Sequence, residues 1–419
     1  MRKKAASQCC PSNGRARSQT PCECLDFVEA SHRHRVYPVI YCHMEIKGHL
    51  DLTRLKDALQ QTSRLIPEIL YVFDFKKGIF TDIGLCVDDI ILWGKQLYLW
   101  DLSRKPQLQI SIRRTEQRDT VIVGISHILA DGNGFLQYLY LLSSLYNHPH
   151  INLPRENERN LFPLLRNIHV KKQRFPDRFL PSGKRPPLPL LRSPNGGTSC
   201  FCMVSQIPET DFLALHEKAK KKQVTLNDLF MTAYARIIAR QNAIDTVHLP
   251  CPADLRLFHP IKDRLTVANM TGIFKNVVIE VKPRHTFNDT LSQVHLEMER
   301  QKACFLCFEG IQLLHGLFRK LPLPLLSAAI KAAYRPLPVS YTNIGMIDHR
   351  KFAFHGCEIE SCYLTGTYRL PPDFQLSVST FRHVCTLNCT LIGQSGDEQT
   401  GQILLDQVKK ELLDWTYAP

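Results

Sequence analysis

The sequence predicts an α/β or α+β fold arranged in two lobes, each mixing strands and helices. Three observations lead to this class. The chain has 419 residues, which is more than one ordinary hydrophobic core accommodates. Segments with strand periodicity and segments with helical periodicity both occur on either side of the middle of the chain. A proline-rich stretch, 147–197, separates the two sides and predicts a connector.

Residues 1–24 predict a basic, disordered tail. Positions 1–21 carry five Lys or Arg and no acidic residue, and no apolar segment follows them as it would in a secretory signal. The first lobe is therefore expected over 25–146.

Helical and strand patterns follow one another in this first lobe. Apolar residues at helical spacing from Leu52 to Leu65 predict a helix, which Pro67 ends. The stretch 108–114, "LQISIRR", alternates apolar and polar residues, and 120–126, "TVIVGIS", is apolar on both faces. These two stretches predict a hairpin whose second strand is buried.

A further helix is predicted between Phe135 and Tyr146, and the connector follows it. Residues 147–200 carry ten Lys or Arg against three acids, so the tail and this stretch account for twelve of the fourteen surplus positive charges. A nucleic-acid binder more often spreads basic residues along folded elements with aromatics among them. No nucleic-acid partner is therefore predicted, although a local basic patch suits a phosphate-bearing small molecule.

The second lobe is expected over 198–419. Strand-like stretches occur at 201–207, 276–281 and 374–381. A helix is predicted within 225–242, with Thr225 or Asn227 as its cap, and an amphipathic helix at 403–415.

The cysteines predict reduced thiols in a cytoplasmic protein. There are fifteen, an odd number, and no export signal precedes them. Cys304 and Cys307 form a lone C-x-x-C in an apolar, helix-like run, and Cys357 with Cys362 is a poor second pair for zinc. Core packing is favoured over metal binding, and no metal site is predicted.

No transmembrane segment is predicted, because no stretch approaches roughly 18 uninterrupted apolar residues. The best candidate, 321–334, is short and contains Pro322, Pro324 and Lys331. It is compatible with peripheral membrane contact, but a buried helix is the favoured interpretation.

The pattern H-x-x-x-D occurs three times, beginning at His127, His259 and His285. The His259 motif lies in a polar loop. In the His285 motif, Thr286 or Asn288 is expected to cap a helix whose first turn holds the aspartate. Both motifs therefore have simple structural explanations.

His127 is the strongest candidate for chemistry. It ends the buried strand, and Asp131 with Gly132 forms the turn into a buried helix. A neutral imidazole can accept a proton from a hydroxyl or amine near pH 7. Gly132 permits close backbone approach and could leave an N–H free for an oxyanion. A buried Asp131 would need a cationic partner. The alternative is a polar histidine in a structural turn.

The stretch "SHILADG" with the following "FLQYLYLLSSLY" resembles the H-H-x-x-x-D-G region of the condensation-domain and chloramphenicol-acetyltransferase-like acyltransferases. Further segments resemble this superfamily in its own order and span most of 25–419: "PEILYVF", "WDLSRKPQLQISIRR", "VTLNDLFMTAYARII", "PADLRLF" and "VSYTNIG". The chain looks like a stand-alone alcohol acetyltransferase or a condensation-like member.

The resemblance implies a chloramphenicol-acetyltransferase-like fold with a channel between two lobes and His127 at its centre. An acyl-CoA or an acyl-pantetheine on a carrier protein would be the co-substrate, with no permanently bound cofactor. A small alcohol or amine would be the acceptor. His127 would act as general base while the acceptor attacks the thioester directly.

The resemblance also implies roles for other residues. Asp131 would be a structural acid, Arg256 its cationic partner, and Gly132 would shape the turn. The candidates for the channel and the oxyanion site are Asn343, Thr342 and Ser126, which stands where the motif has its first histidine. The absence of D-F-G-W-G argues against a plant-type enzyme, and the lack of a following carrier or adenylation domain predicts a stand-alone protein rather than a synthetase module. A monomer is expected.

Two other functions stay open on the sequence. A condensation-type protein would act on carrier-bound substrates, with the basic connector docking an acidic carrier. A catalytically degenerate scaffold would keep the fold alone.

Overall fold

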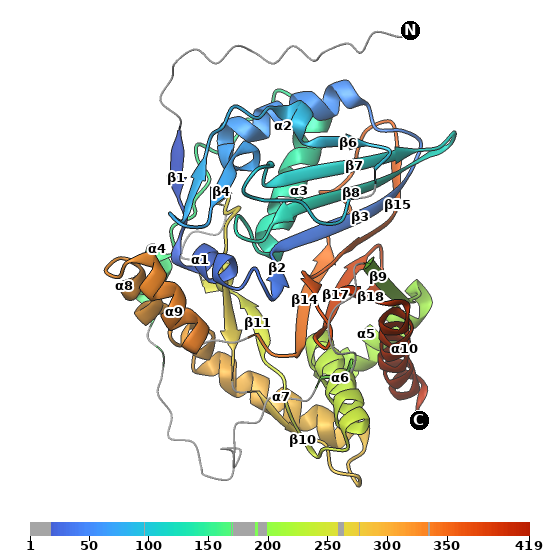
Figure 1. The fold of residues 1–419 in the computed structure, drawn as a ribbon. Helices are drawn as coiled ribbons and strands as arrows, with labels where there is room; N and C mark the ends of the chain where they lie inside the picture. Colours follow the sequence, from blue (N-terminus) through green and yellow to red (C-terminus); the bar gives the residue numbers. More distant parts are fainter. Residues whose placement is uncertain are drawn as a thin grey trace.

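The computed structural model describes residues 18–95, 97–168, 170, 189–191, 199–258, 264–275, 277–333 and 336–419. Two lobes are stacked in Figure 1, each built on a mixed sheet with helices, as the sequence predicts. Two separate clusters of buried apolar side chains form their cores.

The first lobe is built on a five-stranded sheet in the order β15-β3-β8-β7-β6. Its strands are β3 (Val39–Lys47), β6 (Ile91–Trp93), β7 (Leu108–Arg114), β8 (Arg118–Ser126) and β15 (Glu358–Leu364). The predicted hairpin is confirmed, because β7 and β8 pair antiparallel along their length. β6 pairs parallel to β7, which makes the sheet mixed.

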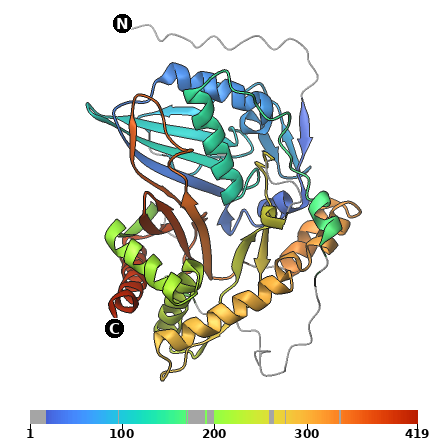
Figure 2. The same cartoon turned by 180° about the vertical axis from the view of Figure 1, so that it is seen from behind.

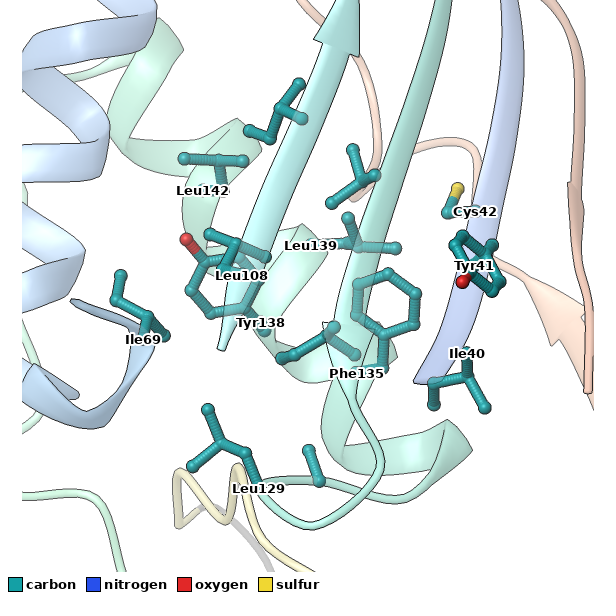
Figure 3. Close-up of a cluster of buried hydrophobic side chains, with 14 of the residues drawn as sticks. Ile40, Tyr41, Cys42, Ile69, Leu108, Leu129, Phe135, Tyr138, Leu139 and Leu142 are labelled. Atoms are coloured by element: carbon teal, nitrogen blue, oxygen red, sulfur yellow. The ribbon is translucent and has the colours of Figure 1, made fainter. Parts of the chain in front are cut away.

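Helices α2 (Leu52–Leu65) and α3 (Gly132–Asn147) cover one face of this sheet (Figure 2). α2 ends before Pro67, as predicted. Figure 3 shows Phe135 and Leu139 of α3 directed at the sheet. Burying a side chain of this size stabilises the fold by about 1.5–3 kcal/mol.

The second lobe is built on a six-stranded sheet in the order β14-β17-β18-β16-β2, with β9 on the other edge of β18. Its strands are β2 (Val36–Tyr37), β9 (Ser199–Ile207), β14 (Val339–Ile347), β16 (Tyr368–Arg369), β17 (Phe374–Phe381) and β18 (Val384–Gly393). The parallel pair β14–β17 and the antiparallel pair β17–β18 make it mixed as well.

Four longer helices belong to the second lobe. They are α5 (Glu209–Lys221), α6 (Leu226–Asn242), α7 (Phe287–Ala303) and α10 (Ser395–Tyr417). The buried residues of α9 (Leu323–Ala333), Leu326 and Ile330, belong to the first core. Of the two caps proposed for α6, Thr225 is the one used, because its hydroxyl accepts from the Asp228 N–H at 3.1 Å. Thr286 caps α7 in the same way.

Shorter elements complete the fold. The helices are α1 (Cys24–Ser31), α4 (Phe162–Asn167) and α8 (Ile311–Phe318); the strands are β1 (Gln19–Pro21), β4 (Val72–Asp74), β5 (Ile79–Thr81), β10 (Thr246–His248), β11 (Cys251–Asp254), β12 (Thr271–Phe274) and β13 (Val278–Glu280).

Each sheet contains a strand from the part of the chain that builds the other lobe. β2 directly precedes β3 in sequence but pairs with β16 of the second sheet. β15 follows β14 but pairs antiparallel with β3 of the first sheet. The expected ranges 25–146 and 198–419 therefore do not divide the two sheets cleanly, because hydrogen bonding between distant strands leaves no local sequence signal.

The prediction of a disordered tail through residue 24 is wrong for its last seven residues. β1 pairs antiparallel with β5, and Cys22 and Cys24 are buried. The charges that suggested a tail precede this stretch. Residues 1–17 lie outside the described part of the chain.

The prediction that 321–334 is a buried helix is also wrong. In α9 only Leu326 and Ile330 are buried, and Leu325 is 60% exposed. One face of the helix packs on the protein and the opposite face is exposed. The apolar residues of this segment therefore lie partly on the surface. None of the described helices is both long and apolar enough to cross a membrane.

Cys304 and Cys307 are buried in the second core, where both thiols pack among apolar side chains. In the described part of the chain, no group of three or more His, Cys, Asp or Glu residues is placed to hold a metal ion.

Candidate active site

His127 lies where the two sheets meet. It follows the last residue of β8, and its N–H donates to the carbonyl of Pro38 at 2.8 Å. Pro38 is the single residue between β2 of the second sheet and β3 of the first. The backbone of His127 is therefore fixed at the crossing point of the lobes.

The imidazole of His127 is partly exposed, and its two nitrogens differ. Nδ1 is enclosed and has no hydrogen-bond partner among the described residues. Nε2 is not enclosed, and within the same residues no hydrogen bond occupies it. Nε2 is thus the nitrogen available to a substrate. To accept a proton there, the neutral ring must carry its hydrogen on Nδ1.

Asp131 ends the loop and caps α3. Its Oδ1 accepts from the Gly134 N–H at 2.8 Å, as expected of an N-cap. Its Oδ2 accepts from the Met270 N–H at 2.7 Å, the Thr271 hydroxyl at 2.8 Å and Arg256 Nη1 at 3.0 Å. Burial raises the pKa of Asp131, but the charge of Arg256 and these hydrogen bonds outweigh burial and hold the pKa below its usual value.

Arg256 uses all five of its side-chain N–H donors inside the protein. Nη1 donates to Asp131 and Asp254, both at 3.0 Å. Nε donates to the Thr266 hydroxyl at 2.8 Å, and Nη2 to the carbonyls of Thr266 and Ala268 at 2.9 and 2.8 Å. The structure therefore brings Asp131 and Arg256 together, and Arg256 keeps no donor for a substrate.

A second buried ion pair supports the loop from another direction, and the sequence alone did not reveal it. Asp26 of α1 accepts from Arg159 Nη2 at 2.6 Å, and Arg159 Nη1 donates to the Leu129 carbonyl at 2.9 Å. The side chains are 1% and 10% exposed. Arg159 belongs to the stretch interpreted as a connector, where its basic neighbours concealed a buried role.

Asn269 links this second pair to His127. Its Nδ2 lies 2.9 Å from Asp26 Oδ1, 2.8 Å from the His127 carbonyl and 3.1 Å from the Ile128 carbonyl. Asn269 is 4% exposed. A single amide within the apolar run "VANMTGIF" is the one sequence signal that could have pointed to it, since a buried amide needs partners.

Residues 265–270 form the shared support of the site. The carbonyl of Ala268 accepts from the Asp131 N–H at 3.1 Å, and Thr266 receives hydrogen bonds from Gln137 and Arg256. On the other side, Asn157 exchanges two hydrogen bonds with the backbone of Val267. The described part of the connector thus packs against the segment that holds the loop from His127 to Asp131.

The glycine that permits close approach is Gly134, so this part of the prediction for Gly132 is wrong; an oxyanion contact of the Gly132 N–H stays a prediction. A Cβ on Gly134 would lie 2.7 Å from the carbonyl oxygen of Ala268 and 3.1 Å from Arg256 Nη2. A Cβ on Gly132 would meet only the side chain of Ile344, at 3.4 Å. Gly132 begins α3 with an ordinary backbone conformation.

Ser126 does not line a channel, which corrects its predicted role. Its side chain is fully buried, and its hydroxyl accepts from the Ile128 N–H at 3.3 Å. Its carbonyl accepts from the N–H groups of Leu129 and Ala130. Ser126 shapes the turn after β8.

Thr342 and Asn343 lie on β14 and are partly exposed. Asn343 Oδ1 accepts from the Gly345 N–H at 2.9 Å across an irregularity in the pairing of β14, and its Nδ2 lies 3.4 Å from Asn227 Oδ1. Among the described residues, neither side chain is hydrogen-bonded to His127. The Ile344 side chain, between Asn343 and Gly345, lies 3.4 Å from the position that a Cβ on Gly132 would take.

The other H-x-x-x-D motifs do not join this site. In the His285 motif, Asp289 accepts from the N–H and hydroxyl of Thr286, both at 2.8 Å, and so completes the cap of α7. The motif at His259 lies outside the described residues.

Known proteins resemble this chain in three-dimensional structure. No family model matches the sequence, and no curated protein matches it either. Trichothecene 15-O-acetyltransferase from Fusarium sporotrichioides superposes with a TM-score of 0.68 at 12% identity, covering 97% of this chain and 96% of that one. Polyketide synthase associated protein 5 from Mycobacterium tuberculosis gives 0.67 at 15% identity, covering 94% and 98%.

The first condensation domain of the calcium-dependent antibiotic synthetase also gives 0.67, at 13% identity, covering 96% and 97%. The chain has the condensation-domain, or chloramphenicol-acetyltransferase-like, fold. The match covers nearly the full length of each protein, so both lobes and their connection belong to this fold. At these identities the likeness establishes the fold alone.

Proposed function

We propose that the protein is an acyltransferase that moves an acyl group from a thioester to an alcohol or amine. His127 Nε2 removes the proton of the acceptor while the acceptor oxygen or nitrogen attacks the thioester carbonyl. The thiolate of the donor then leaves and takes up a proton. No acyl-enzyme forms in this scheme, and no permanently bound cofactor takes part.

The observation that carries the proposal is the way His127 is held. Two buried ion pairs, Asp131–Arg256 and Asp26–Arg159, fix the loop around it, yet neither pair contacts its ring in the described structure. Burying four charged groups costs free energy, and such a cost is expected where the position of a reacting side chain must be fixed. The accessible Nε2 is the atom that this arrangement positions.

The donor is proposed to be acyl-CoA or an acyl-pantetheine on a carrier protein, and donor and acceptor are proposed to enter by a channel between the lobes. Both classes of reaction are represented by name among the similar structures, an acetyltransferase and a condensation domain. Turnover with a carrier-bound thioester but with no small thioester would favour the condensation-type alternative.

The test is release of free thiol from acetyl-CoA, followed with a panel of alcohols and amines. We expect wild-type turnover, and a loss of about 10²–10⁴-fold in kcat for His127→Ala, as for removal of a general base. His285→Ala, in the motif that only caps α7, is the matched control and should retain wild-type rates.

Equal rates for His127→Ala and wild type would refute the proposed mechanism. Absence of turnover with every small thioester and every carrier-bound thioester would instead favour a degenerate scaffold.

A further inference from the structure

A pocket of about 260 Å³ lies between α1, β12, α8 and α9, and its wall shares Thr271 with the candidate active site. α1 contributes Leu25 and Val28 to its wall, and β12 contributes Thr271 and Ile273. The volume is just below the range of about 300–1,000 Å³ that is usual for small-molecule sites. It therefore suits a slender ligand.

The lining is aliphatic. Among the residues that the structure describes, every lining residue except Thr271, Lys275 and Glu309 is apolar or glycine, and none of these described residues is aromatic. A planar ring or a nucleobase is usually recognised by stacking on aromatic side chains, which this wall lacks. An alkyl chain needs only aliphatic contact. The two charged residues have opposite sign and so favour neither an anionic nor a cationic ligand.

Thr271 is shared by the pocket wall and the support of the candidate active site. The Thr271 hydroxyl donates to Asp131 Oδ2 at 2.8 Å, while the same residue lines the pocket. Asp131 is four residues from His127 in the same braced loop. One residue of β12 thus belongs both to the pocket wall and to the hydrogen bonds that hold Asp131.

α9 turns a helical stripe toward the pocket. Its lining residues are Leu326, Ala329, Ile330 and Ala333, which follow the spacing of one helix face. Leu326 and Ile330 are buried, whereas Ala329 is exposed although it lines the pocket. Ala329 therefore borders the opening, and small side chains keep this part of the wall thin.

We infer that this pocket binds an alkyl chain, and that the acyl donor or the acceptor of the transfer is a lipid-like molecule rather than an acetyl group or a compact alcohol. The assignment to a substrate rests on the proposed function, but chain binding itself does not. The alkyl chain could belong to the acyl thioester or to a fatty alcohol, and separate measurements distinguish these two sources.

The binding test is calorimetric titration of the full chain with decanoate. We expect saturable binding with a negative heat-capacity change, because apolar surface is removed from water. Ala329→Trp should fill the opening and weaken affinity at least tenfold. Ala328→Trp is the matched control, because Ala328 is exposed on the same helix but does not line the pocket; it should bind decanoate within twofold of wild type.

The catalytic test compares decanoyl-CoA with acetyl-CoA as donor, and decanol with ethanol as acceptor. Ala329→Trp should lower kcat/KM at least tenfold only for the partner whose chain occupies the pocket. The His127→Ala variant should still bind decanoate, which separates this inference from the proposed function. Equal decanoate affinity of the two tryptophan variants, or no saturable binding, would overturn the inference.

Discussion

We propose that Asp131 and Arg256 position the loop of His127 and make no contact with a substrate. Asp131 has each carboxylate oxygen occupied, and Arg256 has each donor occupied. An ion pair whose hydrogen-bonding atoms are all occupied fixes the surrounding backbone in one arrangement. It has no polar atom left to contact a substrate. A reacting group must be placed to within about 0.5 Å, and saturation of its support is one way to reach that precision.

Removal of Arg256 should destabilise the whole protein. Arg256→Ala leaves the buried charge of Asp131 without its cation, which typically costs about 3–5 kcal/mol. Urea unfolding followed by circular dichroism measures the change. Arg240→Ala removes an arginine that is 58% exposed and pairs with Glu411, and should cost less than about 1 kcal/mol. Similar losses for the two variants would contradict the role given to Arg256.

The depressed pKa of Asp131 should be visible in the pH dependence of stability. A carboxyl whose pKa is lower in the folded state contributes stability above its unfolded pKa of about 3.9, and that contribution is lost as pH falls through the folded pKa. Asp131→Asn removes this contribution. Between pH 5 and 3, roughly, its unfolding free energy should fall less steeply than that of wild type, by up to about 1.4 kcal/mol per pH unit. Parallel curves would show that Asp131 titrates normally.

The sequence located His127 and Asp131 and proposed Arg256 as partner, because motif and order along the chain carry that information. It did not reveal Asp26, Arg159 or Asn269. These three come from separate elements and meet only through tertiary structure. Arg159 stands in a basic, proline-rich stretch, so its sequence context does not distinguish it from the neighbouring basic residues that were expected to be solvated.

At the scale of elements, the first turn of α3 is pressed against residues 265–270. The contact explains why a glycine stands at position 134, inside a helix where alanine would otherwise be favoured. It also fixes the direction in which the loop from His127 enters the helix. The spacing of apolar residues predicted α3 and its buried stripe. The crowding around Gly134 could not be predicted in this way, because it depends on where residues 265–270 lie in the folded protein.

Two alanine substitutions in α3 should therefore differ in effect. Gly134→Ala places a Cβ 2.7 Å from a backbone oxygen, which cannot move away cheaply, and should cost about 1–3 kcal/mol. Gly132→Ala meets only a flexible side chain at 3.4 Å and should change stability by less than about 1 kcal/mol. Chemical denaturation of both variants measures the difference. A larger loss for the Gly132 variant would reverse the assignment of the crowded glycine.

The sequence predicted helices and strands correctly where a segment has its own helical or strand periodicity. The β7–β8 hairpin and helix α2 were predicted near their observed bounds, because alternation and Pro67 act locally. β2, β15 and β16 were not predicted. The first and last are only two residues long, and all three depend on partners far away in sequence.

At the scale of the molecule, the exchange of β2 and β15 ties the lobes together. Tyr41 of β3 packs its ring against Tyr368 of β16 at 5.4 Å between centroids, and the Arg35 guanidinium bonds to Asp373 at 3.1 Å. Neither lobe has a complete sheet without a strand from the other part of the chain.

We therefore expect the lobes to unfold together. Differential scanning calorimetry should give one transition with a calorimetric enthalpy equal to the van't Hoff enthalpy. Leu364→Ala, which opens a cavity at the end of β15 where the chain leaves the first sheet, should shift that single transition by a loss of about 2–5 kcal/mol. Two resolved transitions, with only one of them moved by the substitution, would show that the lobes are independent.

The position of β15 also bears on how the chain is made. The other strands of the first sheet are complete by Ser126, but β15 ends at Leu364. At a synthesis rate of about 5–20 residues per second, the ribosome needs roughly 10 to 50 s to produce the missing strand. During that interval one edge of β3 is open to other chains. The nascent protein should therefore depend on chaperone shielding more than a protein whose amino-terminal domain closes on itself.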